Sequence, residues 1–468
     1  MLFVSFTFLF FFPVVLAVRW LAPRRLAAPW LLLASYVFYM SWGPVYGLLL
    51  GGATAASFAL GLAMDRWRSH RKTFLVLGAA GALGTLAFFK YAGFLATQGW
   101  NVARLFGWKG PVPELDIVLP LGISFYLFET ISYLADVYKG RPAERSIVNY
   151  GLFVAFFPHL VAGPILRVTE IVPQFRDCPP FDAGRFEEGL GLTLRGCIKK
   201  AVLADNLAVW SDQVFRAHQG ASTLGLWVGV LAYTGQIYCD FSGYTDMARG
   251  CAKMLGYDLP DNFLLPYLSS SPTDFWRRWH MTLSRWLRDY LYITLGGSRR
   301  GRARTYVNLL VTMALGGLWH GAAWKFVAWG VYHGLLLAAH RAFGELWSGA
   351  RAAAVRASHA YRALAIMATF FAVMIGWVFF RAANLGDALE IIAGLFRYKA
   401  HVKTPEEMRV AVCMLLALAT GHALGSRRLF EKAYGLLPGA VRGLALAAMV
   451  AAIYLFATST GAFIYFQF

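Results

Sequence analysis

The sequence predicts an all-α polytopic membrane protein, and three observations lead to that fold class. Of the 468 residues, 58% are hydrophobic and only 15% are charged, which is unlike the composition of a soluble domain. Apolar runs of bilayer-spanning length recur from one end of the chain to the other. The loops between them carry many Lys and Arg residues, as cytoplasmic loops do. We therefore expect a single membrane domain over residues 1–468 and no soluble domain.

The composition also excludes several classes of function. A net charge of +19 would suggest nucleic acid binding in a soluble protein, but basic cytoplasmic loops explain it here, so no nucleic acid partner is expected. The five cysteines are scattered and form no C-x-x-C pair, which argues against structural zinc and disulfides. The sequence contains no H-E-x-x-H, G-x-S-x-G, Walker A or G-x-G-x-x-G motif. We expect neither a metal nor a bound cofactor.

The first part of the chain predicts five spans joined by short loops. The N-terminus lacks a basic segment, so its apolar run is expected to be a span and not a cleaved signal. Two spans separate the basic residues at 19–25 from those at 66–72, so both groups are expected on the cytoplasmic side. Residues 98–116 are then an outer loop. The expected spans are Leu2–Val18, Trp30–Met40, Val45–Met64, Phe74–Leu95 and Ile117–Val137.

The next apolar segment, residues 150–166, has the features of a re-entrant segment. It contains F-F-P-H-L-V-A-G-P-I, in which Pro158 and Pro164 would break a straight helix. Both flanks are basic, which argues against a full crossing. Non-helical backbone at membrane depth is tolerated only where protein shields it or where it lines a cavity. The preceding span also holds Glu129 and Asp136, so the sequence indicates a polar interior.

The second part of the chain adds further spans around a central polar stretch. Residues 167–200 are expected on the cytoplasmic side, ending with Lys199 and Lys200. In total we expect roughly ten or eleven crossings together with re-entrant segments. The spans expected outside the central stretch are 201–218, 222–250, 363–380, 410–425 and 442–465.

The span 222–250 carries an unusual set of polar residues in Y-C-D-F-S-G-Y-T-D-M-A. These residues are Asp240, Ser242, Tyr244 and Asp246. Two carboxylates on one membrane helix are energetically expensive, so they indicate a polar interior or a functional site. The alternative is that they pair with arginines of the 277–304 region, and such pairs could still help to build the site.

Residues 272–297 predict one amphipathic helix. Ser271 can cap it, Pro272 suits its first turn, and Gly296-Gly297 ends the segment. The arginines at 277, 278, 285 and 288 fall on one side, where they could face anionic lipid headgroups or a phosphate-rich ligand. The apolar face holds Trp276, Trp279, His280, Leu283, Leu287 and Tyr290. His280 therefore points toward protein.

The following segment, Tyr306–Ala339, contains few charges and carries His320 within G-G-L-W-H-G. The glycines at 316, 317 and 321 allow a close helix approach or a break. A histidine at bilayer depth is a functional candidate, although a core histidine satisfied by a neighbour is the alternative for both His320 and His280. His333 fits the structural alternative better.

Five segments together resemble the membrane-bound O-acyltransferase family, and within it the branch of bacterial alginate O-acetylation proteins. The resemblance extends over nearly the whole chain, with its core motifs in 120–334 and its highest specificity in 239–334. Thr245 departs from the family pattern, where a serine is expected. The segments are P-L-G-I-S-F-Y-L-F-E-T-I-S-Y-L-A-D-V-Y-K-G (120–140), F-F-P-H-L-V-A-G-P-I (156–165), C-D-F-S-G-Y-T-D-M-A (239–248), D-F-W-R-R-W-H-M-T-L-S-R-W-L-R-D-Y-L-Y-I-T-L-G-G (274–297) and G-G-L-W-H-G-A-A-W (316–324).

The resemblance implies a fold and a reaction. The fold is a ring of tilted helices with re-entrant segments around a central cavity, with a tunnel from the cytoplasm to a catalytic histidine. The W-H-G histidine is His320 and the R-R-W-H histidine is His280, and both are expected to be catalytic. His320 would act as general base on a hydroxyl, and His280 would orient substrate or stabilise charge. Substrate-binding roles are expected for Asp240, Ser242, Tyr244, Trp279, Arg278 and Trp319.

The resemblance also implies substrates, partners and a location. The expected donor is acetyl-CoA, whose acetyl group crosses the bacterial inner membrane to O-acetylate an alginate-like polysaccharide. The chain lacks a nucleophile elbow and a large outer domain, so a periplasmic esterase-like (SGNH-type) acetyltransferase is the expected partner, beside membrane lipids. Three alternatives remain open. They are another envelope acceptor such as peptidoglycan or teichoic acid, a proton-coupled transporter, and a scaffold for a complex.

Overall fold

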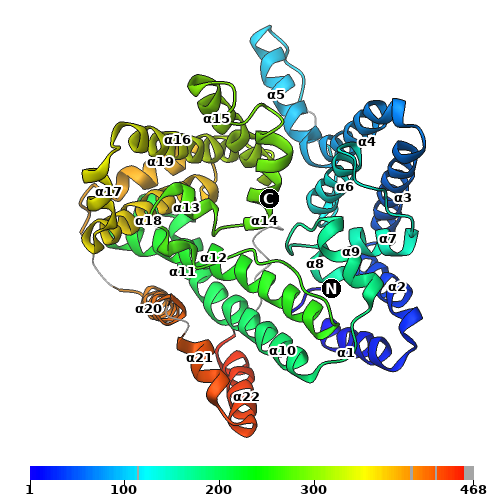
Figure 1. The fold of residues 1–468 in the computed structure, drawn as a ribbon. Helices are drawn as coiled ribbons and strands as arrows, with labels where there is room; N and C mark the ends of the chain where they lie inside the picture. The colour runs from blue at the N-terminus through cyan, green and yellow to red at the C-terminus, as the bar shows by residue number, and fades with distance from the viewer. Residues whose placement is uncertain (113–114, 401–403, 427–428, 458–468) are drawn as a thin grey trace. The chain divides into compact units, whose positions relative to one another are not determined.

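The computed structural model describes residues 1–112, 115–400, 404–426 and 429–457, without the side chains of 426–432 (Figure 1). All regular secondary structure in these ranges is helical. The described chain divides into two compact units. The first unit contains Met1–Thr193 and Met247–Pro260, and the second contains Leu194–Asp246 and the chain from Asp261 onward. The protein is an all-α polytopic membrane protein, as the sequence predicts.

The helices of the first unit follow the predicted spans closely. Ser5 caps the first helix by accepting a hydrogen bond from the Phe8 amide at 3.3 Å, and Pro44 begins the third helix. The bounds are α1 Phe6–Leu21, α2 Ala27–Met40, α3 Pro44–Arg66, α4 Arg71–Leu86, α5 Ala92–Leu105, α6 Ile123–Tyr138, α7 Ile147–Ala155, α8 Phe157–Leu160 and α9 Val168–Asp177. Helix α10 follows α9 and covers Ala183–Cys197.

One predicted loop in this unit is helical. An outer loop is predicted to begin at residue 98, but α4 continues through a π-helical turn, Ala87–Tyr91, into α5, which ends at Leu105. The helix ends only where Gly107 adopts a φ of +91°. The Trp100 indole then donates a hydrogen bond to the Gly110 carbonyl at 2.8 Å, which fixes the chain after the helix.

The broken segment predicted around Pro158 is present and is buried within the first unit. Helix α7 ends before Phe156, α8 is one turn long, and residues 161–167 are not helical. Glu129 of α6 holds this irregular backbone, because its carboxylate accepts a hydrogen bond from the Leu166 amide at 2.8 Å. The same carboxylate lies 3.3 Å from His159 Nδ1. Protein therefore shields the irregular backbone, as membrane depth requires.

The second unit contains the central polar stretch. α10 continues as a π-helical segment, Ile198–Ala204, and α12 begins in this unit and ends in the first. The helices are α11 Asp205–Arg216, α12 Thr223–Met254, α13 Pro272–Trp276, α14 Met281–Trp286, α15 Arg302–His320, α16 Trp324–Leu346, α17 Ala350–Ala357, α18 His359–Arg381, α19 Leu385–Gly394, α20 Glu406–Ser426, α21 Leu429–Leu436 and α22 Gly439–Phe456. A second π-helical segment, Leu287–Tyr292, follows α14.

Helices α15 and α16 pack closely along each other (Figure 1). A Cβ atom built on Gly317 would lie 2.1 Å from the Phe326 carbonyl oxygen, and one built on Gly330 would lie 2.2 Å from the Met313 carbonyl oxygen. Only glycine permits this backbone separation. The glycines of G-G-L-W-H-G thus allow a close helix approach, as predicted, and this packing fixes the end of α15 where His320 lies.

Five helical stretches of the described chain are long and apolar enough to cross a membrane. Some other predicted crossings correspond to shorter helices, such as the 16-residue α1. The predicted span 222–250 corresponds to the 32-residue α12, which is long enough but is not among the five. The end of the last predicted span, 442–465, lies partly outside the described residues. The five stretches are Pro44–Arg66, Arg68–Leu105, His359–Arg381, Glu406–Gly425 and Gly439–Phe456.

Candidate active site

The predicted amphipathic helix over residues 272–297 is wrong in its middle. Ser271 caps α13 as expected, accepting from the Asp274 amide at 3.1 Å, but α13 ends at Trp276. The helix resumes only at Met281, after His280 has adopted a left-handed φ of +43°. The periodicity of the sequence therefore describes two short helices with a kink between them. The helical structure ends at Tyr292, before the predicted end at Gly296-Gly297, and both glycines lie in the turns that follow with positive φ.

The kink has a physical cause in a loop that precedes it in the chain. The Met281 amide donates to the Asn262 carbonyl at 3.0 Å, and the Leu264 amide donates to the Arg278 carbonyl at 2.9 Å. These bonds replace the intrahelical bonds that a continuous helix would make. A left-handed conformation is unfavourable for a residue with a Cβ atom, so the surrounding contacts must hold His280 in it.

Asn262 also fixes the imidazole of His280, which is 0% exposed. The Asn262 side-chain oxygen accepts from the Thr282 amide at 3.1 Å and from the Thr282 hydroxyl at 3.0 Å. It lies 3.3 Å from His280 Nδ1. Because the Thr282 amide can only donate, the accepting atom of Asn262 must be its oxygen, so Nδ1 carries a proton. In the neutral ring, Nε2 is then the basic nitrogen.

Burial keeps this imidazole neutral. His280 lies outside the candidate membrane spans. Desolvation lowers the pKa of His280 from 6.5 to about 3. The ring is therefore uncharged at neutral pH. Its edge contacts the ring of Phe241, with the centroids 4.7 Å apart, so the 239–248 segment and the 274–297 segment meet at this histidine.

His320 lies beside His280, which confirms that the chain brings the two predicted histidines together. Their ring centroids are 6.4 Å apart. His320 is the last residue of α15 and is 4% exposed. Trp329 approaches its ring edge-on at 5.1 Å, and Phe380 lies at 5.3 Å. Two buried imidazoles therefore lie side by side in an apolar, aromatic setting, which strengthens electrostatic interactions within the site.

The two predicted tryptophans also belong to this cluster. Trp319 contacts both imidazoles, at 6.0 Å from His280 and 5.0 Å from His320. Trp279 stacks on Phe275 at 5.7 Å and contacts Trp377 at 4.8 Å. Trp319 is thus part of the wall around the histidines, whereas Trp279 supports the backbone that precedes His280.

Lysine and arginine side chains from α10 and the π-helical segment after it lie against the two carboxylates of the 239–248 segment. Asp240, which is 2% exposed, lies 2.7 Å from the ammonium of Lys200. Asp246 lies 2.7 Å from Lys199 and 3.2 Å from Arg195. The suggested pairing with arginines of the 277–304 region stays a prediction. A buried carboxylate requires a nearby cation. Here the cations come from the end of α10 and from the π-helical segment Ile198–Ala204.

The remaining predicted substrate-binding residues have simpler surroundings. Arg278 donates through Nε to Asp274 at 2.9 Å, so its guanidinium takes part in a local ion pair. Ser242 and Tyr244 are buried at 1% and 3% exposure. The substrate-binding roles of these residues stay predictions. His333 is packed between aromatic rings, with Trp329 at 4.9 Å and Trp276 at 5.2 Å, in line with the structural role expected for it.

Sequence reasoning missed Asn262 and Lys200. Asn262 lies in the loop P-D-N-F between two recognised segments, and only its contacts reveal that it positions His280. Lys200 was assigned to a cytoplasmic loop, yet it is 4% exposed and also lies 2.8 Å from Asp205. A signal existed for Lys200, because two buried carboxylates in one span require cations from a neighbouring segment.

Comparisons with known proteins show which family the chain is similar to. Residues 138–383, which include both histidines, match the family model of the membrane-bound O-acyltransferase (MBOAT) family. The chain is 43% identical over 403 residues to a Pseudomonas putida protein named "Probable alginate O-acetylase AlgI", covering 85% of this chain and 81% of that protein. It is 38% identical to the peptidoglycan O-acetyltransferase of Helicobacter pylori, covering 78% and 73%. The teichoic acid D-alanyltransferase of Streptococcus thermophilus is 28% identical, over 46% of this chain and 55% of that protein.

Proposed function

Since the chain belongs to the membrane-bound O-acyltransferase family, we propose that it moves an acetyl group from cytoplasmic acetyl-CoA across the bacterial inner membrane. The acetyl group then O-acetylates an extracytoplasmic, alginate-like polysaccharide, through a periplasmic SGNH-type acetyltransferase that acts as partner. The similarity to the alginate O-acetylase of Pseudomonas putida supports the choice of acceptor. The observation that carries the chemistry is the pair of buried imidazoles at 6.4 Å.

In the proposed reaction, His320 is the general base. It accepts the proton of the acceptor hydroxyl as the oxygen attacks the thioester carbonyl, and the C–S bond breaks when the tetrahedral intermediate collapses. The proton then passes from His320 to the departing thiolate, so the imidazole returns to its neutral form. A neutral base in a buried, aromatic setting suits this step, since it creates no isolated charge before the hydroxyl arrives.

The contact with Asn262 favours one of the two roles expected for His280. With Nδ1 donating to Asn262, the neutral ring offers Nε2 as a hydrogen-bond acceptor. Such an acceptor cannot stabilise an oxyanion or a thiolate, and the single proton of the attacking hydroxyl goes to His320. We therefore assign His280 to orienting the substrate, by accepting a hydrogen bond from a second N–H or O–H group of the substrate.

One specific observation favours a second acceptor. The peptidoglycan O-acetyltransferase of Helicobacter pylori is 38% identical over 397 residues, nearly as similar as the alginate relative. Transfer of acetyl to peptidoglycan is therefore the second candidate. Supplying each purified polymer to membranes that contain the protein and its periplasmic partner would separate the two acceptors.

Sealed membrane vesicles test the proposed route of the acetyl group. Radiolabelled acetyl-CoA is supplied only to the cytoplasmic face or only to the periplasmic face, with polymer and the partner acetyltransferase on the periplasmic side. We expect labelled polymer only when the donor has access to the cytoplasmic face. Equal labelling from a donor confined to the periplasmic face would exclude the route.

A further inference from the structure

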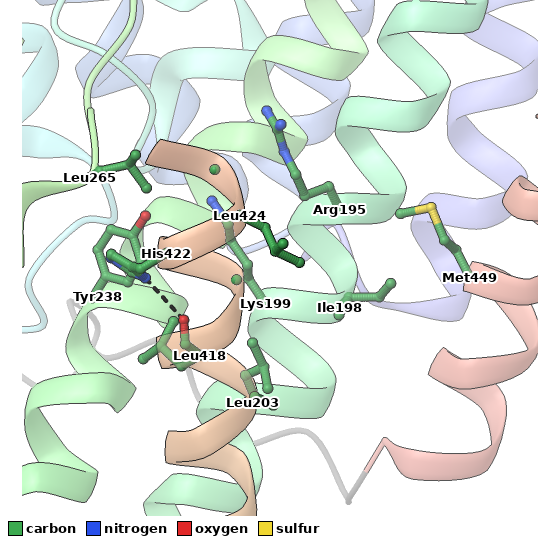
Figure 2. Close-up of a pocket in the computed structure, with 13 residues that line it drawn as sticks. Arg195, Ile198, Lys199, Leu203, Tyr238, Leu265, Leu418, His422, Leu424 and Met449 are labelled. Atoms are coloured by element: carbon green, nitrogen blue, oxygen red, sulfur yellow. Dashed lines mark hydrogen bonds between the residues drawn. The ribbon is translucent and has the colours of Figure 1, made fainter. Parts of the chain in front are cut away.

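The second unit contains a pocket of about 320 Å³ that lies apart from the histidine contacts described above (Figure 2). Residues of α10, the π-helical segment, α12, α20 and α22 form its wall, together with one residue of the chain after α12. The described lining residues are Arg195, Ile198, Lys199, Leu203, Tyr238, Leu265, Ala417, Leu418, Gly421, His422, Leu424, Gly425 and Met449.

The polar groups of this pocket are concentrated and cationic. Arg195 and Lys199 are its charged lining residues, and no carboxylate occurs among the described lining residues. Figure 2 shows both cationic side chains extending toward the same end of the view, with Leu203 and Leu418 at the other end. Both cations bind Asp246 outside the lining, so these three groups together carry one net positive charge. The pocket therefore has a positive end and an apolar end.

The apolar end makes water an unfavourable occupant. A volume of 320 Å³ corresponds to about ten water molecules, each of which needs two to four polar partners. The lining offers only four polar side chains, those of Arg195, Lys199, Tyr238 and His422, and the Nδ1 atom of His422 is already bonded to the Leu418 carbonyl at 3.1 Å. A hydrocarbon chain would fill this space and leave few polar groups unsatisfied.

Candidate membrane spans lie beside the pocket, so a hydrocarbon chain can enter it from the membrane. Helix α20 supplies six of the described lining residues and α22 supplies one, and both helices are candidate membrane spans. No residue of α22 is buried, and Leu444 and Leu455 are 70% and 69% exposed. Exposed apolar side chains on a membrane span face lipid, so the pocket opens beside helices that lipid covers.

We propose that this pocket binds an anionic glycerophospholipid of the membrane. Its phosphate lies at Arg195 and Lys199, and one acyl chain lies along Leu203 and Leu418. Phosphate oxygens accept charge-assisted hydrogen bonds from guanidinium and ammonium groups, and basic pockets between membrane helices are suited to such headgroups. The basic residues of the sequence predict that residues 167–200 lie on the cytoplasmic side, where anionic lipids are concentrated. The lipid would connect α20 and α22 to α10 and α12.

Filling the pocket tests this proposal. A Cβ atom at Gly421 of α20 would meet nothing within 4 Å, so Gly421→Leu places a side chain in open space at the pocket wall. Gly81→Leu is the matched control, because Gly81 lies in the helical interior of α4 within another candidate span and is equally unobstructed. Arg195→Gln, at a side chain that is 47% exposed, removes one headgroup contact and leaves the Lys199–Asp246 pair intact.

The measurements are the phosphatidylglycerol retained after purification and the thermal unfolding midpoint in nanodiscs. We expect Gly421→Leu to reduce retained phosphatidylglycerol at least about ten-fold, which corresponds to 1.4 kcal/mol, whereas Gly81→Leu retains as much as wild type. Phosphatidylglycerol nanodiscs should raise the midpoint of wild type above that in phosphatidylcholine, as a ligand of the native state does. Arg195→Gln should reduce this difference.

Four results would overturn the proposal. The first is equal retention by wild type and Gly421→Leu, and the second is equal stabilisation by phosphatidylcholine and phosphatidylglycerol. The third is displacement of phosphatidylglycerol by oleate at equal concentration, which would indicate a free fatty acid. The fourth is displacement by acetyl-CoA, which would assign the pocket to the acyl donor.

Discussion

Asn262 shows how a residue that performs no chemistry can define a site. Its side-chain oxygen holds His280 Nδ1, and its backbone carbonyl accepts from Met281, so it fixes both the ring and the left-handed backbone of the histidine. The sequence identifies His280 and His320 as the candidates because a histidine at bilayer depth is energetically costly unless it faces protein or a polar cavity. It could not identify Asn262, because an asparagine in a short loop is ordinary until its contacts are known.

Replacing Asn262 is expected to impair catalysis through His280. Asn262→Ala leaves His280 Nδ1 and the two Thr282 donors without their acceptor, which costs about 1–3 kcal/mol of stability per unsatisfied group. We expect a lower kcat with a smaller change in KM, because the substrate that His280 orients is poorly positioned for the reaction. The measurement is steady-state acetyl transfer by folded protein in vesicles.

Asn262→Asp separates this role from a purely structural one. The carboxylate can still accept from Thr282 and His280, but its charge favours the imidazolium and so raises the pKa of His280 from its value of about 3. The reaction needs neutral His280. As the pH is lowered, Asn262→Asp should therefore lose activity at a higher pH than wild type does. An unchanged pH profile in a folded Asn262→Asp variant would contradict the assigned role.

The helices illustrate which elements hydrophobic patterning predicts well. The helices α1 to α3 lie within a few residues of their predicted bounds, because long apolar runs leave little choice of structure. The span predicted at Phe74–Leu95 instead continues through α4 and α5 to Leu105, and α6 begins six residues after the predicted Ile117. Patterning failed at residues 277–280, where the periodicity continues but the backbone bonds to the loop at 262–264 instead. Those bonds join residues distant in sequence, so no local pattern could reveal them.

The packing of α15 on α16 makes a prediction at this scale. Gly317→Leu would place atoms into the Phe326 carbonyl, which lies 2.1 Å from a Cβ atom there, and would force the helices apart. Overpacking costs about 1–3 kcal/mol and often more against backbone, so the unfolding midpoint in detergent should fall by several degrees. Gly344→Leu in α16, where nothing lies within 4 Å, is the control and should unfold like wild type. Equal stability of the two variants would be inconsistent with the close helix approach.

At the scale of the whole molecule, composition and basic loops predict a polytopic membrane protein, and the structure and the family agree. The predicted ring of helices, the cytoplasmic tunnel and the sidedness of the loops stay predictions. Charge pairing was harder to foresee. Pairing of the α12 carboxylates with arginines of 277–304 was one of two open interpretations, and Arg195, Lys199 and Lys200 lie against these carboxylates. These cations come from α10 and the π-helical segment Ile198–Ala204, and no local pattern of the sequence shows which segment lies beside α12.

The central claim is that His320 is the base that activates the acceptor hydroxyl, and His320→Ala tests it most directly. His333→Phe is the matched control, because His333 is a buried ring in the same aromatic cluster and neither of its ring nitrogens has a hydrogen-bond partner among the described residues. With both variants inserted and folded, polymer acetylation from cytoplasmic acetyl-CoA is measured in vesicles. We expect His320→Ala to lose a factor of about 10²–10⁴ in rate, as loss of a general base does, and His333→Phe to stay near wild type. Acetylation at the wild-type rate by folded His320→Ala protein would contradict the claim.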